Sequence, residues 1–130
     1  MGRGGVIVLD SSALLAYFRR ERGADIVASV LTQSTISIVN LAEVLSKAVE
    51  RGQDPKAMHT DIRALGIAVA PFDKEQALRA AFLRRLTTQK GLSLGDRVCL
   101  ALALVNNCEV LTGEHVWIGL PHGAKVTLIR

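Results

Sequence analysis

Four acidic residues stand at positions where an open α/β sheet would bring them together. Asp10 ends an apolar, strand-like run, Glu43 and Asp96 lie near the starts of apolar helical segments, and Glu114 follows a second strand-like run. In open parallel sheets, ligands bind in the crevice at the carboxyl ends of the strands. The shared position of the four acids therefore predicts a carboxylate-lined metal site at that edge.

Each acid also has a structural explanation when it is considered alone. The segments Asn40–Glu43 and Ser93–Asp96 both match the capping box, in which a polar residue caps a helix and an acid three residues later reaches back. Asp10 could simply end a buried strand and begin a helix, and Glu114 could be a solvated turn residue. The common placement of all four favours one shared site.

Converging carboxylates require a compensating charge. A pair of them ~4 Å apart costs about 4 kcal/mol at an effective dielectric constant near 20, so protonation or a bound cation must relieve the repulsion. Oxygen-only ligands favour Mg²⁺ or Mn²⁺ over zinc or copper. Such a site suits hydrolysis of a phosphodiester bond, because the metal activates water and stabilises the charge that develops on the phosphate.

Short apolar runs alternate with helical patterns along the chain. The runs that predict strands are Val6–Leu9, Thr35–Val39, Ile67–Phe72, Glu109–Thr112 and Val126–Ile129. The segments that predict helices begin at Ser11 or Ser12 and then span Ala24–Leu31, Leu41–Arg51, Pro55 to about Gly66, Lys74–Leu86 and Leu94–Asn107. This order predicts an α/β fold with a mainly parallel five-stranded sheet and helices on both faces. We expect one domain over residues 1–130.

Two of these helices carry different apolar patterns. In Lys74–Leu86, the residues Ala77, Leu78, Ala81 and Phe82 share one face, which we expect to point inward. Leu94–Asn107 is apolar almost all round and is therefore expected to be the most buried helix of the domain.

The charge balance favours a polyanionic partner. The chain has 16 Lys and Arg and 12 Asp and Glu, a formal charge of +4, and if four acids share one crevice the rest of the surface carries +8. Such a rim would attract a polyanion. The candidate contacts are Arg19, Arg20, Arg22, Arg84, Arg85, Lys90 and Arg97.

Apolar runs in the chain are too short for a membrane span. The longest one, Val98 to Val105, falls far short of the ~20 residues that cross a bilayer. Only Val6 to Leu9 are continuously apolar before Asp10, which is shorter than the ~7 to 15 residues of a signal-peptide core. The sequence thus predicts a cytoplasmic protein.

One motif points to different chemistry. Gly91–Gly95 matches the G-x-S-x-G nucleophile elbow of serine hydrolases. That elbow requires a strand directly before the serine, whereas the preceding segment is polar and helix-like. Ser93 is better explained as a helix cap.

The acidic segments together resemble a known family. Asp10 in "VLDSSALLA", Glu43 in "NLAEVLSKA", Asp96 in "SLGDRVCLALA" and Glu114 in "LTGEHVW" are similar to the acidic signature of PIN-domain ribonucleases, specifically VapC-type toxins, and "PFDKEQALRAA" resembles the middle of that family. The resemblance implies a three-layer α/β/α PIN fold and Mg²⁺-dependent endoribonuclease activity. It also implies a homodimer and a cognate VapB-type antitoxin that blocks the active site.

The resemblance also implies roles for individual residues. Asp10 and Asp96 would be the principal metal ligands, and Glu43 would hold a metal-bound water or a second ion. The polar supports that orient the acids would be Ser11, Asn40 and Thr112. At position 114 the family usually has aspartate, so direct contact of Glu114 with the metal does not follow from the pattern, although its carboxylate chemistry is retained.

Two other functions are compatible with parts of the sequence. A receiver-like signalling domain would use Asp73, Thr112 and Lys125 at strand ends, but it would leave Glu43 and Asp96 without a role. A PIN-like domain that binds RNA or a partner without cutting would be favoured by a lost acid, and none of the four is lost.

Overall fold

In the computed structural model, which describes residues 6–87 and 91–130, five parallel strands form one sheet in the order β3-β2-β1-β4-β5. The strands are β1 Ile7–Leu9, β2 Ser34–Ser37, β3 Ala68–Ala70, β4 Glu109–Thr112 and β5 Lys125–Leu128. The helices are α1 Ser11–Phe18, α2 Ala24–Ala28, α3 Ile38–Glu50, α4 Pro55–Ala64, α5 Lys74–Thr87 and α6 Leu94–Asn106, with short 3-10 helices at Leu31–Gln33 and His115–Trp117. The predicted α/β fold with a parallel five-stranded sheet is confirmed.

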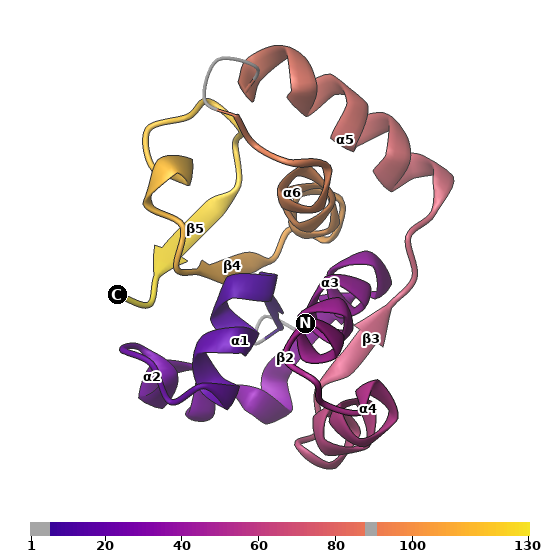
Figure 1. Cartoon of the computed structure of the whole chain (residues 1–130). Helices are drawn as coiled ribbons and strands as arrows, with labels where there is room; N and C mark the ends of the chain where they lie inside the picture. The colour runs from indigo at the N-terminus through magenta and orange to yellow at the C-terminus, as the bar shows by residue number, and fades with distance from the viewer. Residues whose placement is uncertain (1–5, 88–90) are drawn as a thin grey trace.

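Helices cover both faces of the sheet (Figure 1). Successive side chains of a strand point to opposite faces, so Leu9 packs into one apolar cluster and its neighbour Val8 into another. Helices α1 to α4 supply the first cluster, whereas α5 and α6 supply much of the second. Because α3 contacts both α1 and α6, side chains from these three helices can meet at the carboxyl edge of the sheet.

Helix α3 begins earlier than the sequence pattern predicts. The Ser37 hydroxyl accepts a hydrogen bond from the Val39 amide at 3.2 Å and caps the helix there. Asn40 therefore lies inside the first turn and is fully buried, so the capping box predicted for Asn40–Glu43 is wrong. The box at Ser93–Asp96 is confirmed, because both reciprocal hydrogen bonds are present.

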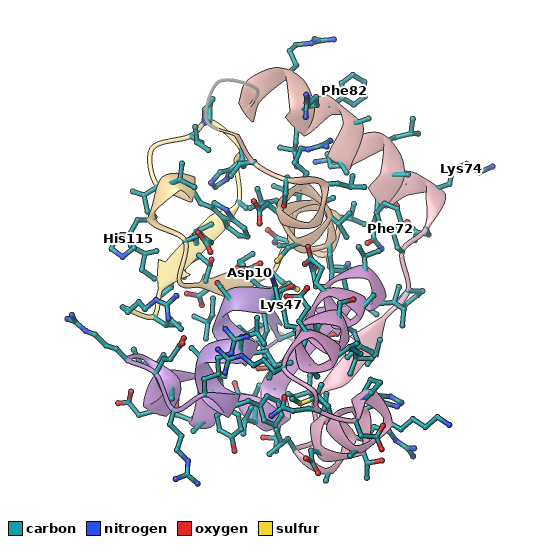
Figure 2. The ribbon with its side chains drawn as sticks, viewed as in Figure 1. Asp10, Lys47, Phe72, Lys74, Phe82 and His115 are labelled. Atoms are coloured by element: carbon teal, nitrogen blue, oxygen red, sulfur yellow. The ribbon has the colours of Figure 1, made fainter. Side chains whose placement is uncertain are left out.

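Helix α5 is rotated relative to the prediction. The face expected to point inward is exposed, with Leu78 at 60% and Phe82 at 61% exposure, and Phe82 projects from the outer side of the helix in Figure 2. The buried residues of α5 include Ala80 and Leu83, which lie on the opposite face. The Arg97 guanidinium helps to fix this orientation by donating a hydrogen bond from α6 to the Ala80 carbonyl at 3.0 Å.

Helix α6 is the most buried helix, as its pattern predicts. Its residues from Val98 to Ala103 are all buried between the sheet and the neighbouring helices α3 and α5. Within residues 6–87 and 91–130, no helix has the length and apolar character that crossing a bilayer would require.

Candidate active site

All four acids line one cavity at the carboxyl edge of β1 and β4. The cavity has a volume of about 190 Å³ and is lined by Asp10, Ser11, Ser12, Leu15, Glu43, Lys47, Asp96 and Glu114. A larger cavity of about 960 Å³ opens at the other end of the strands, but Glu109 is the one acid on its wall among the described residues. The smaller cavity is the better candidate for an active site because all four predicted acids lie on its lining.

Asp10 is the most deeply buried acid of the cavity. It follows β1 directly, is 2% exposed, and caps α1 through the Ser12 amide. Its Oδ2 accepts hydrogen bonds from the hydroxyls of Ser12 at 2.5 Å and Thr112 at 2.9 Å. Because these bonds all go to Oδ2, Oδ1 is the oxygen that remains for a ligand.

Burial controls the charge of Asp10. The pKa of this carboxyl is raised from 3.8 to about 6, mainly by desolvation and to a smaller extent by the charge of Asp96, while the hydrogen bonds from Ser12 and Thr112 act in the opposite direction. An acid in this state binds a proton or a cation more readily than an exposed carboxylate does.

Asp96 belongs to the capping box of α6 and also lines the cavity. Its Oδ2 accepts the Ser93 amide at 3.0 Å, and its own amide is bonded to the Ser93 hydroxyl at 3.1 Å. Burial raises the pKa of Asp96, the hydrogen bonds to Ser93 lower it, and the charges of Glu114 and Glu43 raise it. Each of the other three acids thus interacts electrostatically with Asp96.

Glu43 is held by side chains from two helices. Its Oε1 accepts hydrogen bonds from the Ser11 hydroxyl at 2.5 Å and from the Asn40 amide group at 2.9 Å. Asn40 also donates to the Gly95 carbonyl at 3.0 Å, which ties α3 to the first turn of α6. The structure therefore places Ser11, Asn40 and Thr112 against the acids they were predicted to support.

Gly95 provides the space that Glu43 occupies. A Cβ atom at position 95 would overlap the carboxylate of Glu43. In the sequence, Gly95 belongs to a capping box and to the Gly91–Gly95 match to a hydrolase motif, and it was not among the predicted site residues. Glycine is unfavourable inside a helix, and its presence beside Asp96 was the signal that could have indicated a close approach.

Replacing Gly95 with alanine is expected to lower the RNA cleavage that the family resemblance implies about 10- to 100-fold, because the methyl group must displace the Glu43 carboxylate from Asn40 and Ser11. The melting temperature should change little, since the displaced atoms are the end of a flexible side chain and alanine favours the helix. Cleavage rates and thermal melts of the purified variant test this.

The control variant is Ala57→Ser, on the exposed face of α4. Gly91→Ala would not serve, because Gly91 has a positive φ of 70°, which strains any other residue. A fully active Gly95→Ala protein would contradict the role of this contact.

Glu114 lies at the rim of the cavity and is exposed. The turn that carries it is fixed by two hydrogen bonds, from the Glu114 amide to the Thr112 hydroxyl and from the Gly113 amide to the Ser12 hydroxyl, both at 2.9 Å. Ser12 thereby connects the Asp10 carboxylate to this turn. Ser12 is not among the site residues predicted from the sequence, although a serine two residues after a capping acid is a recognisable signal.

The three residues proposed for a receiver-like site do not come together. Thr112 is the last residue of β4, whereas Lys125 is the first residue of the neighbouring β5 and pairs with Glu109 in the strand register. Lys125 therefore lies at the opposite edge of the sheet, in the larger cavity. Asp73 accepts the Gln76 amide at the start of α5. Ser93 is a helix cap, as expected, and not a nucleophile on an elbow.

The donor set of the cavity suits a hard divalent cation. Its candidate ligands are carboxylate oxygens, and the charges of neighbouring acids raise the pKa of Asp10 and of Asp96, so a cation would offset the repulsion. Within residues 6–87 and 91–130, no three Asp, Glu, His or Cys side chains are grouped closely enough to hold an ion in their present positions. Asp10 and Asp96 are the two acids predicted to bind it.

Known structures share this fold. The chain is similar to a toxin-antitoxin complex from Klebsiella pneumoniae, with a TM-score of 0.76 and 21% identity over 95% of this chain and 98% of that chain. It is similar to DNA-bound VapBC from Salmonella typhimurium, with a TM-score of 0.74 and 16% identity over 96% of this chain and 98% of that chain. It is also similar to VapBC-5 from Mycobacterium tuberculosis, with a TM-score of 0.60 and 24% identity over 97% of this chain and 98% of that chain. No curated protein sequence matches the chain.

The family follows from the sequence itself. The model of the PIN domain family matches residues 7–118, a range that begins in β1 and includes Asp10, Glu43, Asp96 and Glu114. The structural similarities, each below 25% identity, show the same fold. The resemblance predicted from the acidic segments is therefore confirmed, and the chain belongs to the PIN domain family.

Proposed function

We propose that this PIN-domain protein is a Mg²⁺-dependent endoribonuclease that acts as the toxin of a VapBC-type toxin-antitoxin system, with Mn²⁺ able to substitute for Mg²⁺. The observation that carries the proposal is the convergence of Asp10, Glu43, Asp96 and Glu114 on one cavity. The family and the similarity to VapBC structures support it. The presence of all four acids favours cutting over simple RNA binding.

The acids and the polar side chains that hold them have different proposed roles. Asp10 and Asp96 would hold the ion, and a bound Mg²⁺ would supply activation of the attacking water and stabilisation of negative charge on the phosphate. Ser12 and Thr112 hold Oδ2 of Asp10, so its other oxygen has a fixed direction. Ser11 and Asn40 hold Oε1 of Glu43, so its Oε2 can accept a hydrogen bond from the attacking water.

RNA binding is proposed to use basic residues around the cavity. Arg97, one of the residues expected at the rim, has a structural role instead, because its guanidinium donates to the Ala80 carbonyl. Arg85 lies over the Phe82 ring at 5.9 Å, on the outer side of α5. Lys90 lies outside the described residues. The net charge of +4 still favours a polyanionic substrate.

The nuclease proposal is tested by incubating the purified protein with structured RNA in Mg²⁺, Mn²⁺ or EDTA. We expect discrete cleavage products in either metal and none in EDTA. Full cleavage in EDTA would overturn metal dependence, and the absence of cleavage in all three conditions would overturn the nuclease proposal.

Because the similar VapBC structures contain toxin and antitoxin, a VapB-type antitoxin is the proposed partner, and it should inhibit this cleavage in the cytoplasm.

A homodimer is proposed to form through the exposed face of α5. Leu78 and Phe82 lie one turn apart there and are both about three-fifths exposed. We expect Leu78→Glu/Phe82→Glu to convert a dimer into a 14.0 kDa monomer with an unchanged circular dichroism spectrum, because the buried glutamates would repel across the interface. Sedimentation velocity measures this. The matched control is Val49→Glu, which charges an exposed apolar position of α3. A monomeric wild type would refute the interface.

A further inference from the structure

One basic residue shares the cavity with the acids. Lys47 belongs to α3, one turn after Glu43, and among the residues that the structure describes it is the one Lys or Arg on the cavity lining. Residues four apart on a helix are neighbours on its surface, so the two side chains face the same opening. Figure 2 shows Lys47 and Asp10 close together at the centre of the view.

Lys47 is not committed to the acids of the cavity. Its Nζ is 3.5 Å from Oε1 of Glu50, and the two side chains are 51% and 64% exposed. Exposed ion pairs of this kind contribute little to stability, because water screens them and both side chains lose rotational freedom. The lysine head group can therefore leave Glu50 at low cost and turn toward a ligand at the cavity mouth.

The acidic groups of the cavity would repel the negatively charged backbone of an RNA strand. The lining of the cavity includes four carboxyl groups, those of Asp10, Glu43, Asp96 and Glu114. A divalent cation held by these acids would offset their own repulsion, and an incoming phosphate adds further negative charge. The cavity is small, with a volume of about 190 Å³. A cation at the rim would attract and place that phosphate.

We propose that Lys47 binds a non-bridging phosphate oxygen of the RNA strand and positions it at the acidic cavity. Lysine suits this task because its ammonium is a mobile point charge with three hydrogen-bond donors on a long stem. On binding, the Nζ group exchanges Glu50 for the phosphate oxygen, and no covalent bond changes. Lys47 is thus a substrate-positioning residue, and the inference rests on the proposed nuclease function.

The test separates substrate binding from chemistry. Lys47→Ala is expected to raise KM about tenfold while kcat changes little, because a charge-assisted hydrogen bond to the substrate is lost in both the bound and the transition state. In an Asp96→Asn background, in which we expect cleavage to be too slow to interfere, binding of a fluorescein-labelled single-stranded RNA should weaken by the same factor. The slope of log K against log salt should fall by about 0.7, the value for one phosphate contact on a single strand.

Three further variants complete the design. Lys47→Arg should restore KM, because it retains the positive charge. Lys56→Ala removes an exposed lysine of α4 that does not line the cavity and should leave KM unchanged. Glu50→Gln removes the present partner of Lys47 and should bind RNA at least as tightly as the wild type. Thermal melts should show all four proteins folded.

Each result has a distinct meaning. A wild type that cleaves RNA together with a Lys47→Ala protein of unchanged KM and unchanged salt slope would overturn the inference and leave the nuclease proposal intact. Equal losses in Glu50→Gln and Lys47→Ala would show that the ion pair acts as a structural unit, which also overturns it. A wild type that neither binds nor cleaves RNA in any metal would overturn both proposals.

Discussion

Asp96→Asn is expected to lower the rate of metal-dependent RNA cleavage about 10³-fold or more, equivalent to ~4 kcal/mol of transition-state stabilisation. Asp10→Asn should have an effect of the same size. Asparagine keeps the shape of aspartate but removes the charge that would hold the ion. The fold should survive, because an asparagine at position 96 can still accept the Ser93 amide and one at position 10 can still accept Ser12 and Thr112.

The comparison that supports this result uses four proteins on one structured RNA. Wild type, Asp10→Asn, Asp96→Asn and Glu114→Gln would be assayed with Mg²⁺, with Mn²⁺ and with EDTA. Glu114→Gln should lose less activity, because Glu114 is exposed at the rim whereas Asp10 is buried. An Asp96→Asn protein that cleaves like the wild type would mean that this acid is only a helix cap.

The metal-free protein is expected to lose stability as the pH rises from about 4 to about 7. The pKa of Asp10 is raised to about 6 in the folded state from an ordinary value of 3.8, so the folded state holds a proton that the unfolded state has released. Stability from this group is fully present below pH 3.8 and is lost as the pH passes through 6. At about 1.4 kcal/mol per pKa unit, the loss reaches about 3 kcal/mol. The raised pKa of Asp96 acts in the same direction.

Urea unfolding in EDTA across this pH range measures the effect. Other carboxylates also titrate, so the informative quantity is the difference between wild type and Asp10→Asn, whose free energy of unfolding should be higher at pH 7 and less dependent on pH. Excess Mg²⁺ at pH 7 should restore stability to the wild type but not to the variant, because a ligand stabilises only the state that binds it. Parallel pH profiles for the two proteins would contradict the assignment of the shift to Asp10.

Much of this protein is determined by local sequence. The apolar runs fix where strands form, since a short β-branched run without alternation suits a strand buried on both faces. Helices between them force parallel strands, and parallel strands bring their carboxyl ends to one edge. Asp10 and Thr112 directly end neighbouring strands, so their meeting follows from chain order and strand pairing. The acidic segments were also sufficient for the family.

Tertiary structure decided the features that depend on contacts distant in sequence. Helix α3 begins at Ile38, although its first residues have a strand-like pattern, because Ser37 caps it and the buried Asn40 bonds to α6. The orientation of α5 could not be predicted because apolar residues occur on two of its faces, and packing against α6 selects the one with Ala80 and Leu83. The space at Gly95 exists only because α3 and α6 approach closely. Such choices depend on which surfaces meet, and hydrophobic periodicity within one element contains no information about its neighbour.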